Sequence, residues 1–345
     1  MKMNHNNISI FIPHAGCQYQ CAFCNQRTIT KQNNLPHSAE VKKICQQAMF
    51  EIQDKFKIHT EIAFFGGSFT AIQKSYMLEL LESAQEFIGK NKFSGIRIST
   101  RPDCINPEIL ELLKKYHVTS IELGAQSMND KILLANQRGH TEQDIISASK
   151  LIQEYGFELG LQMMIGLYQS TWQDELETVN KIIRIKPNTV RIYPLVILKN
   201  TKLAEIYQAG NYQFFQDNNQ DSLDDVVEMT ALFMQKFMAN HIKIIKIGLH
   251  ASEFVEADKI AGYYHPAFRE LCESRIYRNH IENILKKLNY LENQELVFLV
   301  NKKCISKAIG QKKSNIKYFK NKFSVNIKFR TDEKLELFEV KLLDN

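Results

Sequence analysis

The sequence predicts an α/β fold in which a parallel sheet or barrel is followed by a small α+β module. Short β-branched runs alternate with longer amphipathic stretches through the first 250 residues. The alternation repeats about every 30–45 residues, as expected for βα units. The last part of the chain has a strand–helix–helix–strand pattern instead. We therefore predict a main domain at residues 1–250, a connecting strap at 251–290 and a basic module at 291–345.

The strands of the main domain are expected where β-branched and aromatic residues form short runs. In chain order these runs are Ile8–Ile12, Glu61–Phe65, Gly95–Ser99, Ser120–Leu123, Glu158–Met164, Thr189–Tyr193 and Lys243–Ile247. Amphipathic patterns between them predict helices at Ala39–Gln53, Ser75–Gly89, Pro107–Tyr116, Glu142–Tyr155 and Gln173–Ile185. Strands that alternate with helices in this way are expected to run parallel.

Polar, glycine and cysteine residues directly follow the predicted strands. In chain order they are Cys17–Cys24, Gly66–Ser68, Arg101, Gln126 and Gly166, after the first to the fifth strand. In parallel sheets and barrels, functional residues gather at the carboxyl ends of the strands. The sequence therefore predicts one functional site at that edge.

The segment after the main domain has two parts. The run Glu253–His280 is aromatic and polar without clear periodicity, and we interpret it as a strap that joins the main domain to the tail. Beyond it we expect a strand, two helices and a strand at Leu296–Val300, Cys304–Ile309, Ser314–Asn321 and Val325–Phe329. Residues 299–330 contain ten Lys or Arg and no Asp or Glu. Such a concentrated basic region favours a polyanion as partner.

Composition narrows the class of protein. The chain has 345 residues, 44% of them hydrophobic and 24% charged, with a net charge of +6. These values are ordinary for a globular protein, and no apolar run approaches the roughly 20 residues that span a bilayer. The N-terminal region has only the short apolar run Ile8–Phe11, which is not a secretory signal. We expect a cytoplasmic protein without a membrane partner.

Three of the seven cysteines lie within eight residues, in the pattern Cys17-Gln-Tyr-Gln-Cys21-Ala-Phe-Cys24. In a reducing compartment such a cluster indicates metal ligation or redox chemistry rather than disulfides. Three thiolates from one loop can hold three irons of a [4Fe–4S] cubane and leave the fourth iron open. The alternatives are a thioredoxin-like pair of Cys21 and Cys24, a structural zinc completed by His14 or His37, and buried cysteines without a site.

The C-x3-C-x-Phe-C pattern after a first strand resembles the signature of radical S-adenosylmethionine (SAM) enzymes. The resemblance covers roughly residues 8–200 and is closest to the radical domain of the catalytic subunit of Elongator, with oxygen-independent coproporphyrinogen III oxidases more distant. It is carried by Phe65-Gly-Gly-Ser-Phe69, Ser99-Thr-Arg-Pro-Asp103, Glu122-Leu-Gly-Ala-Gln-Ser127, Gln137-Arg-Gly-His-Thr141, Met163-Met-Ile-Gly-Leu167 and Val190-Arg-Ile-Tyr-Pro194. The resemblance implies a partial (βα)6 TIM-type barrel that binds SAM and a [4Fe–4S] cluster, the latter through Cys17, Cys21 and Cys24.

The resemblance also implies which residues contact SAM. A glycine segment after the second strand contacts its amino-acid end, an amide and a guanidinium contact its carboxylate end, and an aromatic side chain lies near the adenine. Carried over to this sequence, these residues are Phe23, Gly66, Gly67, Ser68, Gln126 and Arg138. A guanidinium suits a carboxylate because it donates two parallel hydrogen bonds.

Each of these assignments has a structural alternative. The glycine segment alone makes a tight turn, Gln126 fits a buried amide, Arg138 a solvated charge and Phe23 a packing residue. Two departures from the family affect the cofactor's ribose and adenine: Ser99 stands where many relatives have an acid, and the Gly-Leu-Pro-Gly turn appears as Gly166-Leu-Tyr-Gln169.

Three histidines, His140, His250 and His265, are weaker candidates for acid–base groups. Histidines in such places more often serve as hydrogen-bonded structural residues.

Between the two predicted helices of the basic module lies the segment Ile309-Gly-Gln-Lys-Lys-Ser-Asn-Ile316. It resembles the loop of a KH module, whose β-α-loop-α-β core grips single-stranded RNA through a G-x-x-G sequence. Gly310 matches the first glycine, whereas Lys313 replaces the second. We predict RNA contacts from Gly310, Lys312, Lys313 and Lys317; the alternative is a solvated cationic face on a domain-packing module.

Together these patterns predict an enzyme that cleaves SAM reductively to a 5′-deoxyadenosyl radical and abstracts hydrogen from a substrate. RNA is the leading substrate, and a flavodoxin- or ferredoxin-like electron donor is the expected partner. The catalytic subunit of Elongator combines its radical domain with an acetyltransferase domain and modifies tRNA. The segment after the barrel does not have the acetyltransferase pattern, so we do not expect this protein to carry out the complete Elongator reaction. The alternatives are a non-catalytic RNA-binding protein with a structural or redox-sensing cluster, and a radical SAM enzyme for a small molecule such as a porphyrin.

Overall fold

A computed structural model of the chain describes residues 6–30, 34–212, 222–250 and 253–343. Contacts within it define two compact units, described separately below. The barrel unit comprises Met1–Asp221 and Phe237–Tyr264, and the C-terminal unit comprises Ser222–Lys236 and His265–Asn345. These limits differ from the expected boundaries at 250 and 290, because residues 222–236 form ion pairs and hydrogen bonds within the C-terminal unit.

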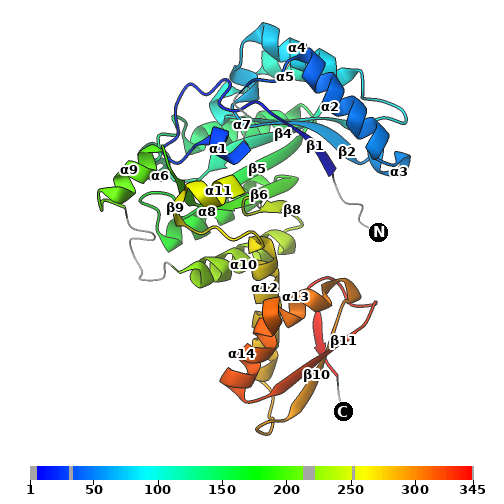
Figure 1. Ribbon diagram of the computed structural model, residues 1–345, viewed down its shortest axis with the longest axis vertical. Coiled ribbons are helices and arrows are strands. Elements are labelled where there is room, and N and C mark those ends of the chain that lie inside the picture. The colour runs from blue at the N-terminus through cyan, green and yellow to red at the C-terminus, as the bar shows by residue number, and fades with distance from the viewer. Residues whose placement is uncertain (1–5, 31–33, 213–221, 251–252, 344–345) are drawn as a thin grey trace. The chain divides into compact units, whose positions relative to one another are not determined.

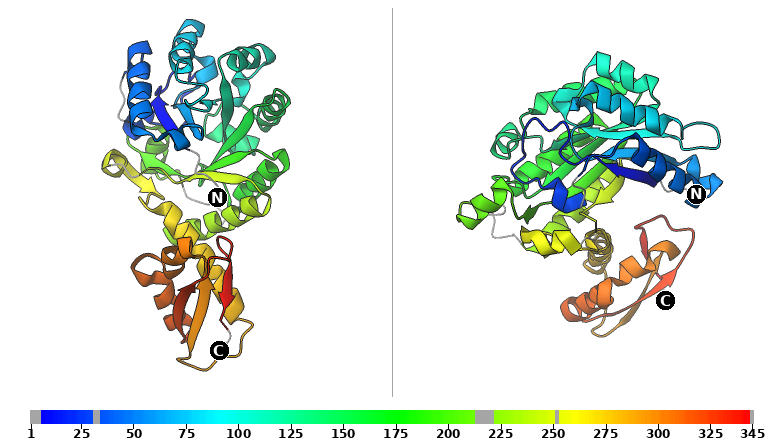
Figure 2. Two further views of the ribbon diagram at one scale, coloured as in Figure 1. Left: turned by 90° about the vertical axis from the view of Figure 1, so that its right-hand side faces the viewer. Right: turned by 45° about the horizontal axis from the view of Figure 1, so that its top comes forward.

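The barrel unit is built on a parallel sheet that curls into a half-barrel (Figures 1 and 2). In the described residues the sheet has seven strands in the order β1-β2-β3-β4-β5-β6-β8. Their bounds are Asn6–Phe11, Thr60–Phe65, Gly95–Thr100, Val118–Gln126, Glu158–Ile165, Thr189–Pro194 and Lys243–Ile247. All six neighbouring pairs are parallel. Each predicted strand is confirmed, and the fold class is the expected partial barrel, with β1 and β8 as its free edges.

Helices cover the outer face of this sheet (Figure 2). The five predicted ones are confirmed as α2, α4, α5, α7 and α8, at Ser38–Glu51, Lys74–Gln85, Pro107–Lys115, Glu142–Glu154 and Trp172–Ile185. Capping boxes at Thr141 and Thr171 fix the starts of α7 and α8. Strand residues such as Ile98, Ile121 and Leu159 are fully buried.

Shorter elements complete the barrel unit. The short helices are α1 (Gln26–Thr30), α3 (Asp54–Lys57), α6 (Asp130–Ala135), α9 (Lys202–Gln208) and α11 (Glu253–Asp258). The 3-10 turns are η1 (Phe69–Ala71) and η2 (Pro102–Cys104), and the short strands are β7 (Val196–Leu198) and β9 (Lys259–Gly262). Strands β7 and β9 pair antiparallel with each other. Helix α10 extends over Leu223–Ala239. No helix in the described part of the chain is long and apolar enough to cross a membrane.

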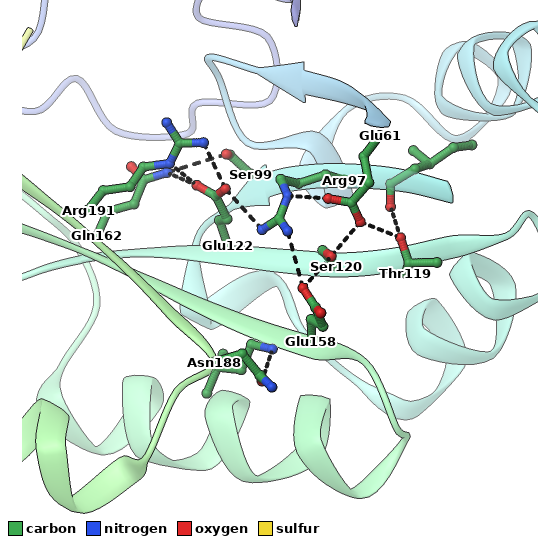
Figure 3. A network of polar contacts seen from close by, with 12 residues as sticks. Glu61, Arg97, Ser99, Thr119, Ser120, Glu122, Glu158, Gln162, Asn188 and Arg191 are labelled. Carbon is green, nitrogen blue, oxygen red and sulfur yellow. Dashed lines mark hydrogen bonds and ion pairs between the residues drawn. The ribbon is translucent and has the colours of Figure 1, made fainter. Parts of the chain in front are cut away.

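A charged network fills part of the barrel interior (Figure 3). Arg97 on β3 is fully buried and donates to Glu61 at 2.7 Å, Glu122 at 3.2 Å and Glu158 at 3.3 Å. Arg191 on β6 donates to both oxygens of Glu122, at 2.6 and 2.9 Å. Burying charges in this way costs desolvation energy, which the shared hydrogen bonds offset. The network fixes the directions of the side chains that line the interior.

The C-terminal unit has a sheet of three described strands in the order β11-β10-β12. Its strands are β10 (Glu295–Val300), β11 (Asn326–Thr331) and β12 (Val340–Leu342). Its helices are α12 (Phe268–Leu285), α13 (Ile305–Ile309) and α14 (Ser314–Phe323), with the 3-10 turns η3 (Lys302–Cys304) and η4 (Gln311–Lys313). Strands β10 and β11 are parallel neighbours, which confirms the predicted strand–helix–helix–strand order. Phe298 and Phe319 are fully buried in the core between this sheet and its helices.

Within the expected strap, residues 268–285 form the 18-residue helix α12, which was not predicted because the segment has no clear periodicity. Its buried residues include Phe268, Cys272 and Ile276, which recur at every fourth position, as on one face of a helix. Polar residues such as Glu273 and Arg275 are also buried there, and they obscured the apolar period. Residues 251–252 of the expected strap lie outside the described part.

Candidate active site

A cavity of about 1230 Å³ opens at the carboxyl ends of the barrel strands. It is lined by the cysteine loop after β1, the glycine turn after β2, and residues of β3 to β8. Every residue predicted to bind the cluster or SAM lines it, namely Cys17, Cys21, Cys24, Phe23, Gly66, Gly67, Ser68, Gln126 and Arg138. The structure therefore brings together residues that are up to 121 positions apart in the chain.

The three cysteines lie half-buried on one loop between β1 and α1. Burial raises the pKa of Cys17, with the neighbouring Cys21 adding to the effect. Burial also raises the pKa of Cys24 to about 12. Metal ligation requires thiolates, so binding a cluster would release protons from these groups. In the described residues no group of His, Cys, Asp or Glu side chains converges on a single ion position; a cubane differs from such a site because it ligates each cysteine through a different iron.

Close backbone packing joins the cysteine loop to the glycine turn. Gly67 has φ +60°, and a Cβ there would lie 2.2 Å from the carbonyl oxygen of Ala15. Gly16 has φ +69°, and its Cβ would lie 2.4 Å from the carbonyl oxygen of Ser68. The Ser68 N–H donates to Ala15 at 2.7 Å. Gly67 is therefore needed for the close packing of the two loops. A Cβ on Gly66 would have more room, because its nearest neighbour would be Gln26 Oε1 at 3.2 Å.

Gln26, which sequence reasoning did not select, ties the two loops together. Its Oε1 accepts hydrogen bonds from the N–H of His14 at 2.6 Å and of Gly67 at 2.8 Å. Its own N–H donates to His14 Nε2 at 3.1 Å. Its side chain also hydrogen-bonds Cys24, which lowers the pKa of that thiol against the larger effect of burial. The only sequence signal was its position two residues after the last cysteine.

Gln126 and Arg138 lie beside the cysteines with polar atoms unsatisfied. Arg138 Nη1 donates to Cys21 Sγ at 2.8 Å and Nη2 donates to the Gly124 carbonyl at 2.6 Å. In the described structure, Arg138 Nε and Gln126 Oε1 are buried without a hydrogen-bond partner, whereas the Ser68 hydroxyl hydrogen-bonds the Cys17 thiol. Arg138 is 6% exposed, so a solvated surface charge is excluded.

Buried polar atoms without partners are rare, because each costs about 1–3 kcal/mol. Arg138 Nε, a donor, and Gln126 Oε1, an acceptor, therefore fit a bound group that offers both acceptors and donors. An amino acid moiety such as that of SAM has this chemistry, so the residues present fit a cluster and SAM at this end of the cavity.

Phe23 packs against the apolar cluster that includes Leu195, Ile197 and Leu203. The Arg138 guanidinium lies 6.0 Å from the centre of its ring. Packing therefore accounts for part of its placement, while the ring still lines the cavity.

The divergent turn Gly166-Leu-Tyr-Gln169 is held by a buried carboxyl group. Gln169 takes a left-handed φ of +65°, where the family has glycine. Glu175 Oε1 accepts from the Gly166 N–H at 2.8 Å and from Ser170 Oγ at 2.9 Å. Burial raises the pKa of Glu175 to about 8. Tyr212 donates to the Gly166 carbonyl at 2.6 Å, so the altered turn remains tightly anchored.

The three histidines have different surroundings. Burial lowers the pKa of His140 to about 4, and its Nδ1 is buried without a partner. His250 lines the cavity, and burial, together with Lys246, lowers its pKa. His265 Nδ1 accepts from the Ala267 N–H at 3.0 Å, a structural role at the start of α12.

The predicted RNA-binding residues surround one turn of the C-terminal unit. Gly310 has φ +78° and ends α13, and Lys312 and Lys313 follow at φ +50° and +61°. Lys312, Lys313 and Lys317 are exposed. Asn315 is fully buried and donates to the Ala308 and Ser274 carbonyls, both at 3.0 Å. This fixes the turn against the unit and presents its lysines to solvent.

One lysine of the basic region has a structural role instead. Lys307 forms an ion pair at 2.7 Å with Glu273, whose side chain is 5% exposed.

Comparisons with known proteins agree with this geometry. Residues 11–182 match the family described as the Radical SAM superfamily, and residues 187–278 match the Radical SAM C-terminal domain. Uncharacterized protein MJ0486 of Methanocaldococcus jannaschii is 30% identical over 222 residues, 63% of this chain and 65% of that protein. tRNA uridine(34) acetyltransferase of the same organism is 32% identical over 143 residues, 40% of this chain and 26% of that protein.

Among solved structures, Methanocaldococcus infernus Elp3 with an N-terminal deletion superimposes with a TM-score of 0.54 at 17% identity, covering 74% of this chain and 62% of that one. The chain thus spans less than two thirds of the length of each of these three proteins. Two adjacent family matches, which together run from residue 11 to residue 278 over a parallel half-barrel, show that this chain belongs to the radical SAM superfamily of enzymes, whose cofactors are a [4Fe–4S] cluster and SAM.

Proposed function

We propose that this enzyme cleaves SAM to a 5′-deoxyadenosyl radical, which abstracts a hydrogen atom from an RNA substrate. When bound, the cluster supplies the single electron that breaks the bond between sulfur and C5′ of SAM. Methionine is released, and the radical becomes 5′-deoxyadenosine when it takes the hydrogen. A flavodoxin- or ferredoxin-like protein is proposed as the source of the electron.

The observation that carries this proposal is the set of three thiols beside unsatisfied polar atoms in one cavity. Cys17, Cys21 and Cys24 would hold three irons, which leaves the fourth iron for SAM. Arg138 Nε, a donor, and Gln126 Oε1, an acceptor, have no partner among the described residues. At the amino-acid end of SAM, Arg138 would donate to the carboxylate and Gln126 Oε1 would accept from the adjoining amino group.

The remaining lining residues at this end would complete the cofactor site. Gly66 has more open surroundings than Gly67, and would contact the amino-acid end together with the Ser68 hydroxyl. Phe23 would flank the adenine. The N–H of Gly67 is already bonded to Gln26, so its proposed role is to hold the turn close to the cysteine loop.

RNA is the proposed substrate because of the C-terminal unit. Its strand–helix–turn–helix–strand order resembles a KH module, and its turn exposes Lys312 and Lys313 in left-handed conformations. Such conformations cost about 1–2 kcal/mol per residue and tend to persist at functional sites. Gly310, Lys312, Lys313 and Lys317 would contact the RNA backbone. One relative, by its printed name, acts on a tRNA uridine, which supports the same substrate class.

Anaerobic reconstitution followed by reduction with SAM tests the reaction. We expect 5′-deoxyadenosine from the parent enzyme and none after Cys17→Ala, Cys21→Ala or Cys24→Ala. Cys104→Ala is the matched control, because Cys104 lies near the cysteine loop without lining the cavity. Cluster assembly without 5′-deoxyadenosine would favour a structural or redox-sensing cluster.

Crosslinking to total RNA tests the substrate class. Replacing both Lys312 and Lys313 by Gln should remove most of the crosslink. Replacing Lys334 and Lys341, two exposed lysines of the same unit, removes equal charge and should retain it. Absence of any crosslink from an enzyme that makes 5′-deoxyadenosine would favour a small-molecule substrate.

A further inference from the structure

A second wall of the cavity lies on β5, β6 and β8, away from the cysteine loop in the chain. Gln162 and Arg191 are register partners on β5 and β6, and Arg191 and Lys246 are register partners on β6 and β8. All three side chains line the cavity, as does Tyr193. The described lining residues include Arg101 and three other Arg or Lys but no Asp or Glu.

Arg191 is held in a fixed orientation at this wall (Figure 3). Its Nε and Nη2 donate to the two oxygens of Glu122, whose side chain is 1% exposed. The Phe65 ring lies under the guanidinium at 4.7 Å. Among the described residues, the third nitrogen, Nη1, makes one long hydrogen-bond contact of 3.4 Å to the Tyr193 hydroxyl. Because Glu122 occupies Nε and Nη2 of Arg191, the edge of the guanidinium that carries Nη1 remains available to donate to a ligand.

The space for this arrangement depends on a glycine. A Cβ on Gly160 would lie 2.8 Å from Cγ of Glu122, so glycine allows the Glu122 side chain to extend across β5 toward Arg191. Glu122 also accepts from Gln162 Nε2 at 2.9 Å, which orients that amide at the same wall.

The charge of the wall is positive toward the cavity. The described residues that line the cavity include no Asp or Glu. The carboxylates of Glu61, Glu122 and Glu158 pair with the guanidinium groups of Arg97 and Arg191. Lys246 adds a further positive charge on the neighbouring strand, and its effect is seen in the lowered pKa of His250. A ligand anion at this wall therefore meets guanidinium, ammonium, amide and phenol groups, while Glu122, the carboxylate bound to Arg191 and Gln162, is not among the described residues that line the cavity.

We propose that this wall binds a phosphate group of the substrate. A phosphate accepts hydrogen bonds through several oxygens and suits a guanidinium next to an ammonium group. Ligand pockets are typically about 300–1,000 Å³, and this cavity measures about 1230 Å³, so there is room for a nucleotide beside SAM. The proposal deepens the proposed function, because it gives a reason why the barrel itself selects a nucleotide.

Equilibrium dialysis of the reconstituted, unreduced enzyme with saturating SAM tests the wall. The probes are labelled uridine 5′-monophosphate and uridine; a pyrimidine avoids competition at the adenine position of SAM. We expect the nucleotide to bind at least about tenfold more tightly than the nucleoside, as for the loss of one charged hydrogen bond. Competition by the dinucleoside monophosphate UpU distinguishes an internal RNA phosphate from that of a free nucleotide.

Two variants and one control locate the binding. Lys246→Gln should weaken nucleotide binding about tenfold and leave nucleoside binding unchanged. Arg191→Lys keeps a charge beside Glu122 for folding but loses the planar fork, and should have the same effect. Lys243→Gln alters an exposed lysine of the same strand and should bind like the parent.

Equal binding of nucleotide and nucleoside, or the same loss in Lys243→Gln, would overturn the proposal. Neither result depends on 5′-deoxyadenosine formation or on RNA crosslinking, which test the proposed function. A phosphate site that persists in an enzyme without RNA crosslinks would indicate a free nucleotide as substrate.

Discussion

Replacing Gln26 by Ala should loosen the cysteine loop from the glycine turn. The change removes the acceptor of two N–H groups, those of His14 and Gly67. Both bonds are partly buried, and a buried donor that loses its partner costs about 1–3 kcal/mol. We therefore expect Gln26→Ala to lower the free energy of unfolding of the apoprotein by about 2–4 kcal/mol.

Gln26→Glu separates the two roles of this side chain. A carboxylate still accepts from both N–H groups, so the apoprotein should keep its stability. It cannot donate to Cys24, however, and it adds a negative charge beside the thiol. Since hydrogen bonds to sulfur raise cluster potentials, the midpoint potential of the reconstituted cluster should fall by on the order of 50–100 mV.

Urea unfolding followed by circular dichroism measures the first effect, and a potentiometric titration followed by electron paramagnetic resonance measures the second. Gln20→Ala is the matched control, because Gln20 is an exposed glutamine of the same loop. The reasoning is refuted if Gln26→Ala unfolds like Gln20→Ala, or if Gln26→Glu has the parental potential.

Three other substitutions test separate parts of the structure. Gly67→Ala should destabilise the apoprotein by more than about 3 kcal/mol in urea unfolding, because the Cβ would lie 2.2 Å from the Ala15 carbonyl oxygen. Gly156→Ala is the control: Gly156 has a φ of +82° and a Cβ there would have no atom within 4 Å, so this change should cost about 1 kcal/mol. The pKa of Glu175 is raised to about 8 from 4.5, so its contribution to stability is lost as the pH rises through 8. Glu175→Gln should therefore gain stability over the parent between about pH 5 and pH 8, and a pH-independent difference in urea midpoints would contradict this. Lys313→Gly should stabilise the protein by about 0.5–1 kcal/mol by relieving its left-handed φ, and a lowered melting temperature would show that the lysine is not strained.

Periodicity alone located the strands and helices of the parallel sheet, and the family resemblance predicted that the sheet forms a partial barrel. Its strands are short β-branched runs between amphipathic helices, and the parallel order follows from that alternation. The helix at residues 268–285 was missed because Glu273 and Arg275 are buried among its apolar positions, which hides the helical period. Short elements such as β7 and β9 were also missed, since three- and four-residue strands carry little pattern of their own.

The candidate site was accessible from sequence where residue type implies chemistry. The cysteine spacing predicted the cluster ligands, the family resemblance predicted the SAM contacts, and all nine of these residues line one cavity. Gln26 and the Glu122–Arg191 pair were not selected as site residues, because their importance arises from contacts between strands and loops. The spacing of residues in the sequence does not reveal such contacts, which are seen only in the folded structure.

The central claim is that three cysteine sulfurs leave one iron of the cluster open to SAM. Electron–nuclear double resonance on the reduced, reconstituted enzyme with SAM labelled by 15N in its amino group and 17O in its carboxylate tests this claim most directly. The account predicts hyperfine coupling of both labels to the cluster. Absence of coupling to either label, in an enzyme that holds a complete four-iron cluster, would contradict it.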